Sequence, residues 1–116
     1  MRFKALSSHK IPNDQLTADY AAAQSTGRLS IGQRCIYVKH TFSTAYLPFS
    51  EMQRAWLRQE TIPGGNVEFH QFFLIVQDRS DKLHWCAVPS YEVGNEILAQ
   101  LESRNPNLKL GYQEQE

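Results

Sequence analysis

The sequence predicts an α+β protein, mainly β, built on an antiparallel sheet. Short segments rich in β-branched and aromatic residues alternate with turn residues through the middle of the chain. A segment near the start and another near the end show helical spacing of apolar residues instead. The length of 116 residues fits one domain, residues 1–116, with one hydrophobic core.

The first expected element is a helix at about residues 14–25. Asn13 or Asp14 can cap its start, because a short polar side chain accepts a hydrogen bond from a free backbone N–H there. Gly27 follows and can adopt the left-handed conformation that ends many helices. The apolar stripe of this helix consists of Leu16, Tyr20 and Ala23.

Strands are expected through the middle of the chain. Pro48 should end one of them, because proline cannot donate a ladder hydrogen bond. Pro63-Gly64 has the chemistry of a type II turn. The apolar run Phe72 to Val76 is typical of a central strand covered on both faces. The expected strands are residues 29–31, 34–40, 45–47, 67–77 and 82–88.

Residues 50–62 fit two structures. Ser50 and Gln53 form a capping box, and Met52, Ala55 and Trp56 suit a helix. The same residues also alternate in a mostly polar pattern that fits a strand near a sheet edge. Local propensity favours the helix.

The last expected element is a helix at residues 91–104. Ser90 can cap it, and Glu92 lies in its first turn, where the helix dipole favours an acid. Asn105-Pro106 should stop it. Its apolar stripe consists of Val93, Ile97, Leu98 and Leu101, so the helix should cover the sheet.

Composition excludes several classes of function. The formal net charge is zero, which argues against nucleic-acid binding and against a polybasic membrane anchor, and permits self-association. The start of the chain lacks the pattern of a signal peptide, and no apolar run is long enough to span a bilayer. A cytoplasmic location is therefore expected. Residues 113–116 are polar and are expected to be frayed.

The cysteines and histidines carry little sign of chemistry. Cys35 and Cys86 lie in apolar strands outside any CxxC pair, as buried free thiols do. His84 and Cys86 would share a strand face, but a zinc site needs three or four converging ligands. A Cys/His enzyme pairing Cys35 with His84, or Cys86 with His40, is the alternative from another class. We expect no metal and no cofactor.

A small basic cluster is the candidate binding site. If residues 50–62 form a strand, Arg54 and Arg58 share a face with Trp56 between them. With Lys39 and His40 they could hold a phosphate, a lipid headgroup, a carboxylate or an aromatic ring. The alternative is a solvated face whose long side chains cover Trp56. Tyr37, Tyr46, Trp56 and Trp85 are expected in the core, and an exposed one would mark a contact surface.

Several short strands followed by one amphipathic helix resemble the pleckstrin-homology-like barrel, especially its small bacterial versions. The resemblance rests on Gly32 to Val38 and on Tyr46 to Met52, which is similar to the step into the fourth strand of such domains. Ser90 to Leu101 is similar to their capping helix. The likeness covers about residues 28–104 and favours a strand over residues 50–62.

The resemblance implies an antiparallel barrel of about seven strands closed by the C-terminal helix, with the N-terminal helix as an addition. Similar domains mostly bind phosphoinositides, peptides or proteins and are rarely catalytic. Their lipid-binding members use a basic cluster in the first hairpin, where this chain offers only Lys39 and His40. The expected function is therefore a non-catalytic binding or scaffolding module for protein contacts, including self-association.

Overall fold

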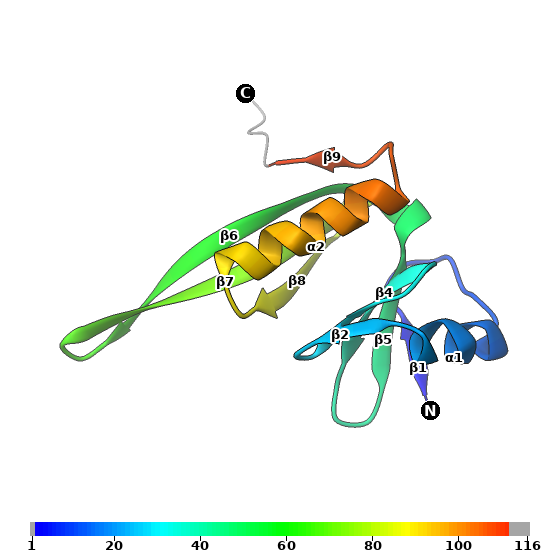
Figure 1. Ribbon diagram of the computed structural model, residues 1–116, viewed down its shortest axis with the longest axis horizontal. Coiled ribbons are helices and arrows are strands. Elements are labelled where there is room, and N and C mark those ends of the chain that lie inside the picture. Colours follow the sequence, from blue (N-terminus) through cyan, green and yellow to red (C-terminus); the bar gives the residue numbers. More distant parts are fainter. Residues whose placement is uncertain (1, 112–116) are drawn as a thin grey trace. The chain divides into compact units, whose positions relative to one another are not determined.

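A computed structural model of the chain describes residues 2–111. The chain divides between Met52 and Gln53 into two compact units, each with its own sheet and helix (Figure 1). The expected fraying of residues 113–116 lies outside the described residues.

The first unit is built on a five-stranded sheet in the order β1-β5-β4-β3-β2. Strand β1 runs parallel to β5, and the other neighbours are antiparallel. A short 3-10 helix, η1 (Phe49–Glu51), ends the unit. The strands are β1 (Phe3–Ala5), β2 (Gln24–Thr26), β3 (Leu29–Ile31), β4 (Cys35–Lys39) and β5 (Thr44–Pro48). Strands β3, β4 and β5 lie where the sequence predicts strands, with ends that differ by at most one residue. Strand β5 ends at Pro48 as expected.

Helix α1 (Asn13–Ala21) covers one face of this sheet. It starts after Pro12 without a side-chain cap, so the predicted capping by Asn13 or Asp14 is wrong. It also ends earlier than expected, because residues 24–26 pair with β3 as β2. Gly27 has a φ of +62° but serves the turn between β2 and β3. The core beneath α1 is formed by Leu16, Cys35, Tyr37 and Tyr46.

Asp19 ties α1 to the loop before β4. Its carboxylate accepts hydrogen bonds from the backbone N–H of Gln33 at 2.8 Å and of Arg34 at 3.2 Å, and from the Tyr37 hydroxyl at 2.7 Å. A Cβ at position 32 would collide with this carboxylate, so Gly32 gives it room.

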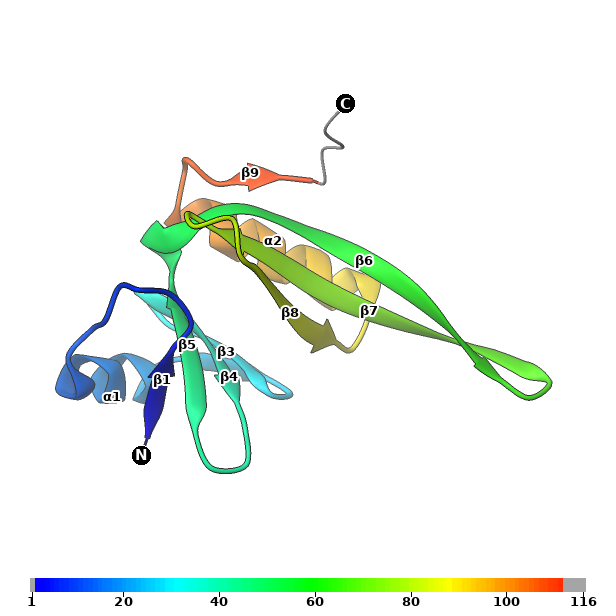
Figure 2. The same ribbon diagram turned by 180° about the vertical axis from the view of Figure 1, so that it is seen from behind.

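The second unit has a four-stranded sheet in the order β8-β7-β6-β9. Strand β9 runs parallel to β6, and β8 is antiparallel to β7 (Figure 2). The elements are β6 (Met52–Gly64), β7 (Val67–Asp78), β8 (Leu83–Val88), α2 (Tyr91–Arg104) and β9 (Lys109–Leu110).

Residues 52–64 form a strand, although local propensity favours a helix. Strand β6 lies between β7 and β9, so backbone pairing outweighs the helical preference of Met52, Ala55 and Trp56. The turn to β7 lies one residue later than expected. Gly65 has a φ of +67°, which suits the first loop residue of a two-residue hairpin, while Gly64 still belongs to β6.

Helix α2 has the predicted bounds and cap. The Ser90 side chain accepts a hydrogen bond from the Val93 N–H at 3.2 Å. Ile97 and Leu101 are buried, and Gly94 allows the Leu57 side chain of β6 to approach the helix backbone. The helix therefore fixes the base of the β6–β7 hairpin.

The predicted barrel of about seven strands with an extra N-terminal helix is wrong. Within residues 2–111 the strands form two separate sheets, and no barrel closes. A barrel would need β5 to continue its pairing into β6. Instead β1 pairs with the edge of β5, and β9 pairs with the edge of β6. The 3-10 helix η1 separates β5 from β6, so the two do not form one continuous strand. The short strands that decide this pairing, β1, β2 and β9, were not predicted.

Candidate functional site

The sheet of the second unit has two different faces. Leu57 of β6 packs over Gly94 of α2, and Phe72 of β7 packs on Tyr91 of α2 with ring centroids 6.2 Å apart. Because side chains alternate along a strand, the odd residues of β6 and the even residues of β7 face α2. The opposite face carries Arg54, Trp56, Arg58, Ile62, Val67, Phe69 and Phe73.

An aromatic and charged cluster lies on this opposite face. The guanidinium carbon of Arg58 lies 5.6 Å from the centre of the Trp85 ring, and Trp85 packs edge-on against Phe73 with centroids 5.6 Å apart. Arg58 Nε also lies 2.8 Å from Glu60 Oε1. Trp85 is 47 % exposed. We call these four residues the Trp85 cluster.

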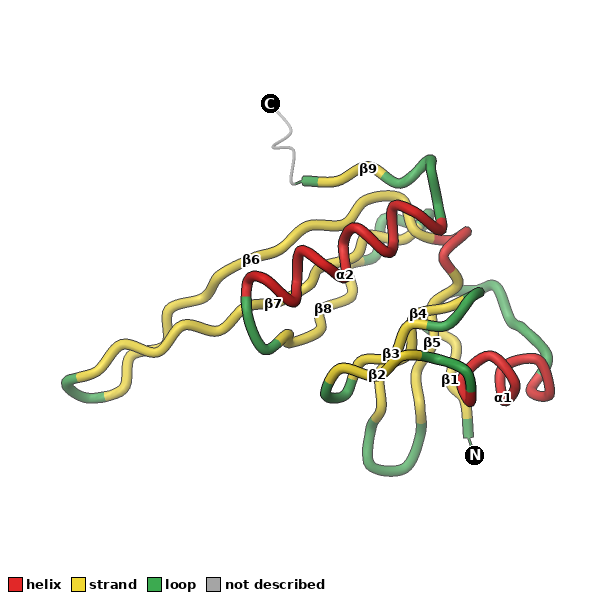
Figure 3. The backbone as a smooth tube through the Cα atoms, in the orientation of Figure 1, coloured by secondary structure: helices red, strands yellow, loops and turns green. Residues whose placement is uncertain are grey.

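The distal part of the β6–β7 hairpin, residues 57–71, is here called the arm. Strand β8 pairs with β7 only from Phe72 to Gln77, and β9 pairs with β6 only at Arg54 and Ala55, so the arm extends beyond both (Figure 3). Every residue from 61 to 70 is exposed. The arm nevertheless carries large apolar side chains on the face of the Trp85 cluster, namely Ile62, Val67 and Phe69.

Two contacts order the side chains of the arm. Gln59 Nε2 and His70 Nδ1 lie 2.8 Å apart on the α2 side of the ribbon. On the other side the Phe69 ring lies directly over Gly64, where a Cβ would collide with it. Val67 and Phe69 are each 57 % exposed. The arm therefore presents an apolar surface to its surroundings.

Among residues 2–111, the outer edge of β6 has no pairing strand along the arm. The Ala55 carbonyl accepts a hydrogen bond from the Gly111 N–H at 2.9 Å, so Ala55 points its backbone groups away from β7. Alternate residues of an antiparallel strand point the same way, which places the N–H and C=O groups of Leu57, Gln59 and Thr61 on this edge. Within residues 2–111 no neighbouring strand pairs with them there.

The predicted site residues fall in both units. Arg54, Trp56 and Arg58 do lie together on one face of β6, as the strand alternative requires. Arg54 donates a hydrogen bond to the Gly111 carbonyl at 3.2 Å. Lys39 and His40 belong to the first unit.

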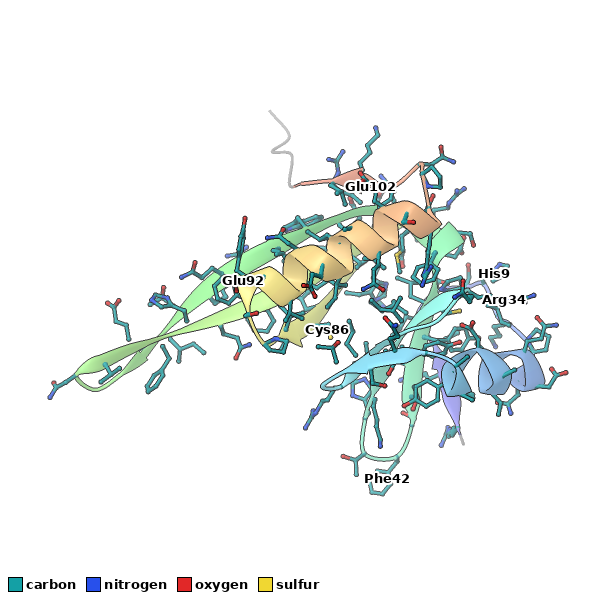
Figure 4. All side chains as sticks on the ribbon, in the orientation of Figure 1. His9, Arg34, Phe42, Cys86, Glu92 and Glu102 are labelled. Atoms are coloured by element: carbon teal, nitrogen blue, oxygen red, sulfur yellow. The ribbon has the colours of Figure 1, made fainter. Side chains whose placement is uncertain are left out.

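In the first unit, Lys39 ends β4 and His40 begins the loop to β5, and both are exposed. Phe42 lies at the tip of this loop and is 90 % exposed (Figure 4).

Sequence reasoning missed the arm. It placed Phe69 in a strand covered on both faces, whereas among the apolar residues of β7 only Leu74, Ile75 and Val76 are buried. It expected Trp85 in the core, but Trp85 is half exposed, while Tyr37 and Tyr46 are buried as expected. The available signal was strand length, since the expected strand 67–77 is longer than its partner 82–88 and must extend beyond it.

The cysteines are poorly placed for nucleophilic chemistry. Burial, with a smaller effect from the nearby Asp19 carboxylate, raises the pKa of Cys35 to about 12. Burial raises the pKa of Cys86, on β8, to about 11 (Figure 4). At neutral pH both therefore remain thiols rather than the reactive thiolate. The expected pairs Cys35–His84 and Cys86–His40 each take one residue from each unit.

The buried Asp78 and the largely buried His84 form a pair with a structural role. Burial alone would raise the pKa of Asp78. Hydrogen bonds from His84 at 2.9 Å and from the backbone N–H groups of Lys82 and Ser80 at 3.1 and 2.8 Å outweigh it, so this pKa lies below its usual value. Asp78 thus holds the turn in which Asp81 has a φ of +67°.

The described part of the chain offers no cluster of metal-binding side chains. Among residues 2–111, no group of three or more histidine, cysteine, aspartate or glutamate side chains could hold a metal ion. Neither of the helices in this range has the length and apolar character needed to cross a membrane.

One comparison with known proteins identifies a family. The model of a family described as "Domain of unknown function (DUF6709)" matches residues 3–116. No curated protein and no solved structure matches the chain significantly. The resemblance to pleckstrin-homology-like domains is therefore not confirmed.

Proposed function

We propose that this chain, which belongs to the DUF6709 family, is a non-catalytic protein-binding module that associates with other copies of itself through the arm. One observation carries the proposal. Ile62, Val67 and Phe69 lie exposed on one face of the arm, and the half-exposed Trp85 lies on the same face of the sheet nearer the base of the hairpin. Several large apolar side chains exposed on one face are typical of interaction sites, because their burial on a partner releases ordered water.

The charges of the arm favour a protein partner over a nucleic acid. Ribbons that bind nucleic acids rely on lysine and arginine to neutralise phosphates. The arm carries one arginine, Arg58, and two glutamates, Glu60 and Glu68. The whole chain has a formal net charge of zero. An aromatic surface with one arginine is instead the composition of protein contact sites.

The alternative functions receive less support. A phosphate or lipid-headgroup site needs cationic groups that are available, but Arg58 is engaged by Glu60 and Trp85, and Arg54 by the Gly111 carbonyl. A Cys/His enzyme needs an activated thiolate, and burial keeps both thiols protonated.

Sedimentation velocity over a range of protein concentrations tests the proposal. The weight-average mass of the wild type should rise with concentration. The triple variant I62S/V67S/F69S should stay monomeric, because it removes the apolar surface without touching a buried side chain. Far-UV circular dichroism checks that the variant is folded.

Phe42→Ser is the matched control, since Phe42 is an exposed aromatic residue outside the arm. It should associate as the wild type does. A wild type that is monomeric at every concentration would refute self-association. Equal weakening by Phe42→Ser would show that general stickiness, and not the arm, drives association.

A further inference from the structure

From the open edge of β6 we infer that two copies pair their β6 strands antiparallel about a twofold axis at Gln59. The inference rests on the proposed function, because it assigns a backbone contact to the association of the arm, in addition to that of its exposed apolar side chains. In this arrangement Gln59 of each copy faces Gln59 of the other, and Leu57 faces Thr61 of the second copy. The backbone groups of these residues are the ones that point to the open edge.

The charges on the arm are self-complementary in this register. Arg58 and Glu60 lie one on each side of Gln59 and share a face of β6. A twofold axis at Gln59 places Arg58 of each copy opposite Glu60 of the other. Together with the existing Arg58–Glu60 contact at 2.8 Å, this produces a network of alternating charges, and opposite charges facing across strands are favourable.

Neighbouring registers are less favourable for identifiable reasons. An axis at Arg58 would set Arg58 against itself, and an axis at Glu60 would do the same with Glu60, so each faces a like charge. An axis at Leu57 would need the Ala55 carbonyl, which already accepts from Gly111. An axis at Thr61 would bring Pro63, which has no N–H, opposite Gln59.

The ends of the ladder are also defined. Strand β9 occupies the same edge of β6 at Arg54 and Ala55, so pairing cannot extend toward the base of the hairpin. On the other side Pro63 cannot donate a hydrogen bond. The pairing segment is therefore Leu57 to Thr61. No lysine and no proline occur within it.

Charge reversal tests this pairing. Arg58→Glu and Glu60→Arg each create two symmetry-related like-charge contacts, and each should weaken the dimer about tenfold. The double variant R58E/E60R restores opposite charges at both contacts and should bring the dissociation constant back to within about threefold of wild type. Analytical ultracentrifugation measures the constants, and thermal unfolding followed by circular dichroism confirms that every variant is folded.

Arg79→Glu is the control, because it makes the same charge change at an exposed position outside the arm. It should leave the dissociation constant unchanged. A wild type that dimerises while R58E/E60R stays as weak as the single variants would overturn the Gln59-centred pairing and leave arm association standing. A monomeric wild type would overturn both.

Gln59→Pro provides a second test, because it removes a backbone N–H that points outward and leaves the bonds to β7 in place. Its side-chain control is Gln59→Ala, which also loses the contact to His70 but keeps the N–H. The proline variant should weaken the dimer at least about tenfold more than the alanine variant does. Equal dissociation constants for the two variants would exclude this backbone ladder.

Discussion

The contact between Gly94 and Leu57 fixes α2 on the base of the arm. Its geometry predicts that the effect of Gly94→Ala on the free energy of unfolding changes sign when Leu57 is shortened. A Cβ built on Gly94 would lie 2.6 and 2.8 Å from the two δ-carbons of Leu57 and 3.3 Å from its γ-carbon. The first two distances are far below van der Waals contact. Gly94→Ala therefore forces either Leu57 or the helix to move.

Two opposing effects set the size of the change. Alanine favours a helix over glycine by about 1 kcal/mol. Overpacking a well-filled contact costs about 1–3 kcal/mol. Since the overlap involves both branches of Leu57, we expect the cost to exceed the gain, and Gly94→Ala should lower the free energy of unfolding by about 1 kcal/mol.

The result should reverse when Leu57 is shortened. Leu57→Ala removes all three carbon atoms that the new methyl group would meet. In that background Gly94→Ala should raise the free energy of unfolding by about 1 kcal/mol, which is the full helix-propensity gain. The coupling between the two sites should therefore be about 2 kcal/mol.

Urea denaturation of the wild type, both single variants and the double variant measures this coupling. The protein should be kept dilute, and the midpoints should be compared at two concentrations so that any contribution of association is visible. Equal effects of Gly94→Ala in both backgrounds would refute the reasoning, because the Leu57 contact would then not limit the approach of the helix.

Three further predictions concern turns and thiols. Gly32→Ala should lower the free energy of unfolding by about 1–3 kcal/mol in urea titrations, because its methyl group meets the Asp19 carboxylate. Asp78→Asn should lower the free energy of unfolding by about 1–3 kcal/mol at pH 7, because it weakens the hydrogen bonds that Asp78 accepts. Because the folded pKa of Asp78 lies below its usual 3.8, the wild type keeps this advantage above pH 3.8 and loses it as the pH falls through the folded value, so the difference between wild type and variant should shrink in urea titrations at successively lower pH. Cys35 and Cys86, with pKa values of about 12 and 11 instead of 9.0, should react with iodoacetamide at pH 7 at least about 100-fold more slowly in the native protein than in urea, as mass spectrometry can show.

Local sequence signals were sufficient to predict helix α2 and strand β8. The cap at Ser90, the apolar stripe through Ile97 and Leu101, and the stop at Asn105-Pro106 predicted α2 with its observed bounds. Strand β8 was also close to its observed bounds, because its loop and its terminal proline mark both ends.

The topology depends on information that single segments do not carry. Strand β1 has three residues and β9 has two, too few to show a period. These strands decide which edges of β5 and β6 remain open, and therefore whether a barrel can close. Local propensity favours a helix at residues 52–64, and only their pairing partners make them a strand.

The candidate site was predicted in part. Alternation placed Arg54, Trp56 and Arg58 on one face, and the structure agrees. The arm was not recognised, because Phe69 and Leu74 are both large apolar residues in one strand. Phe69 lies beyond the strands and the helix that cover Leu74, so one is exposed and the other buried.

The arm has a second open edge, which sets a condition on any assembly of this protein. Strand β8 leaves β7 unpaired on its outer side before Phe72, within residues 2–111. If β6 of one copy paired with β7 of the next, the contact would be head-to-tail, and every added copy would present a fresh edge for the next, as in a growing fibre. A twofold contact uses the same edge on both copies and therefore closes at two. Whether such an assembly stops at two copies or grows into a filament would then depend on which pairing is more stable. The two candidates are β6 with β6, with its Arg58–Glu60 contacts, and β6 with the β7 edge of another copy.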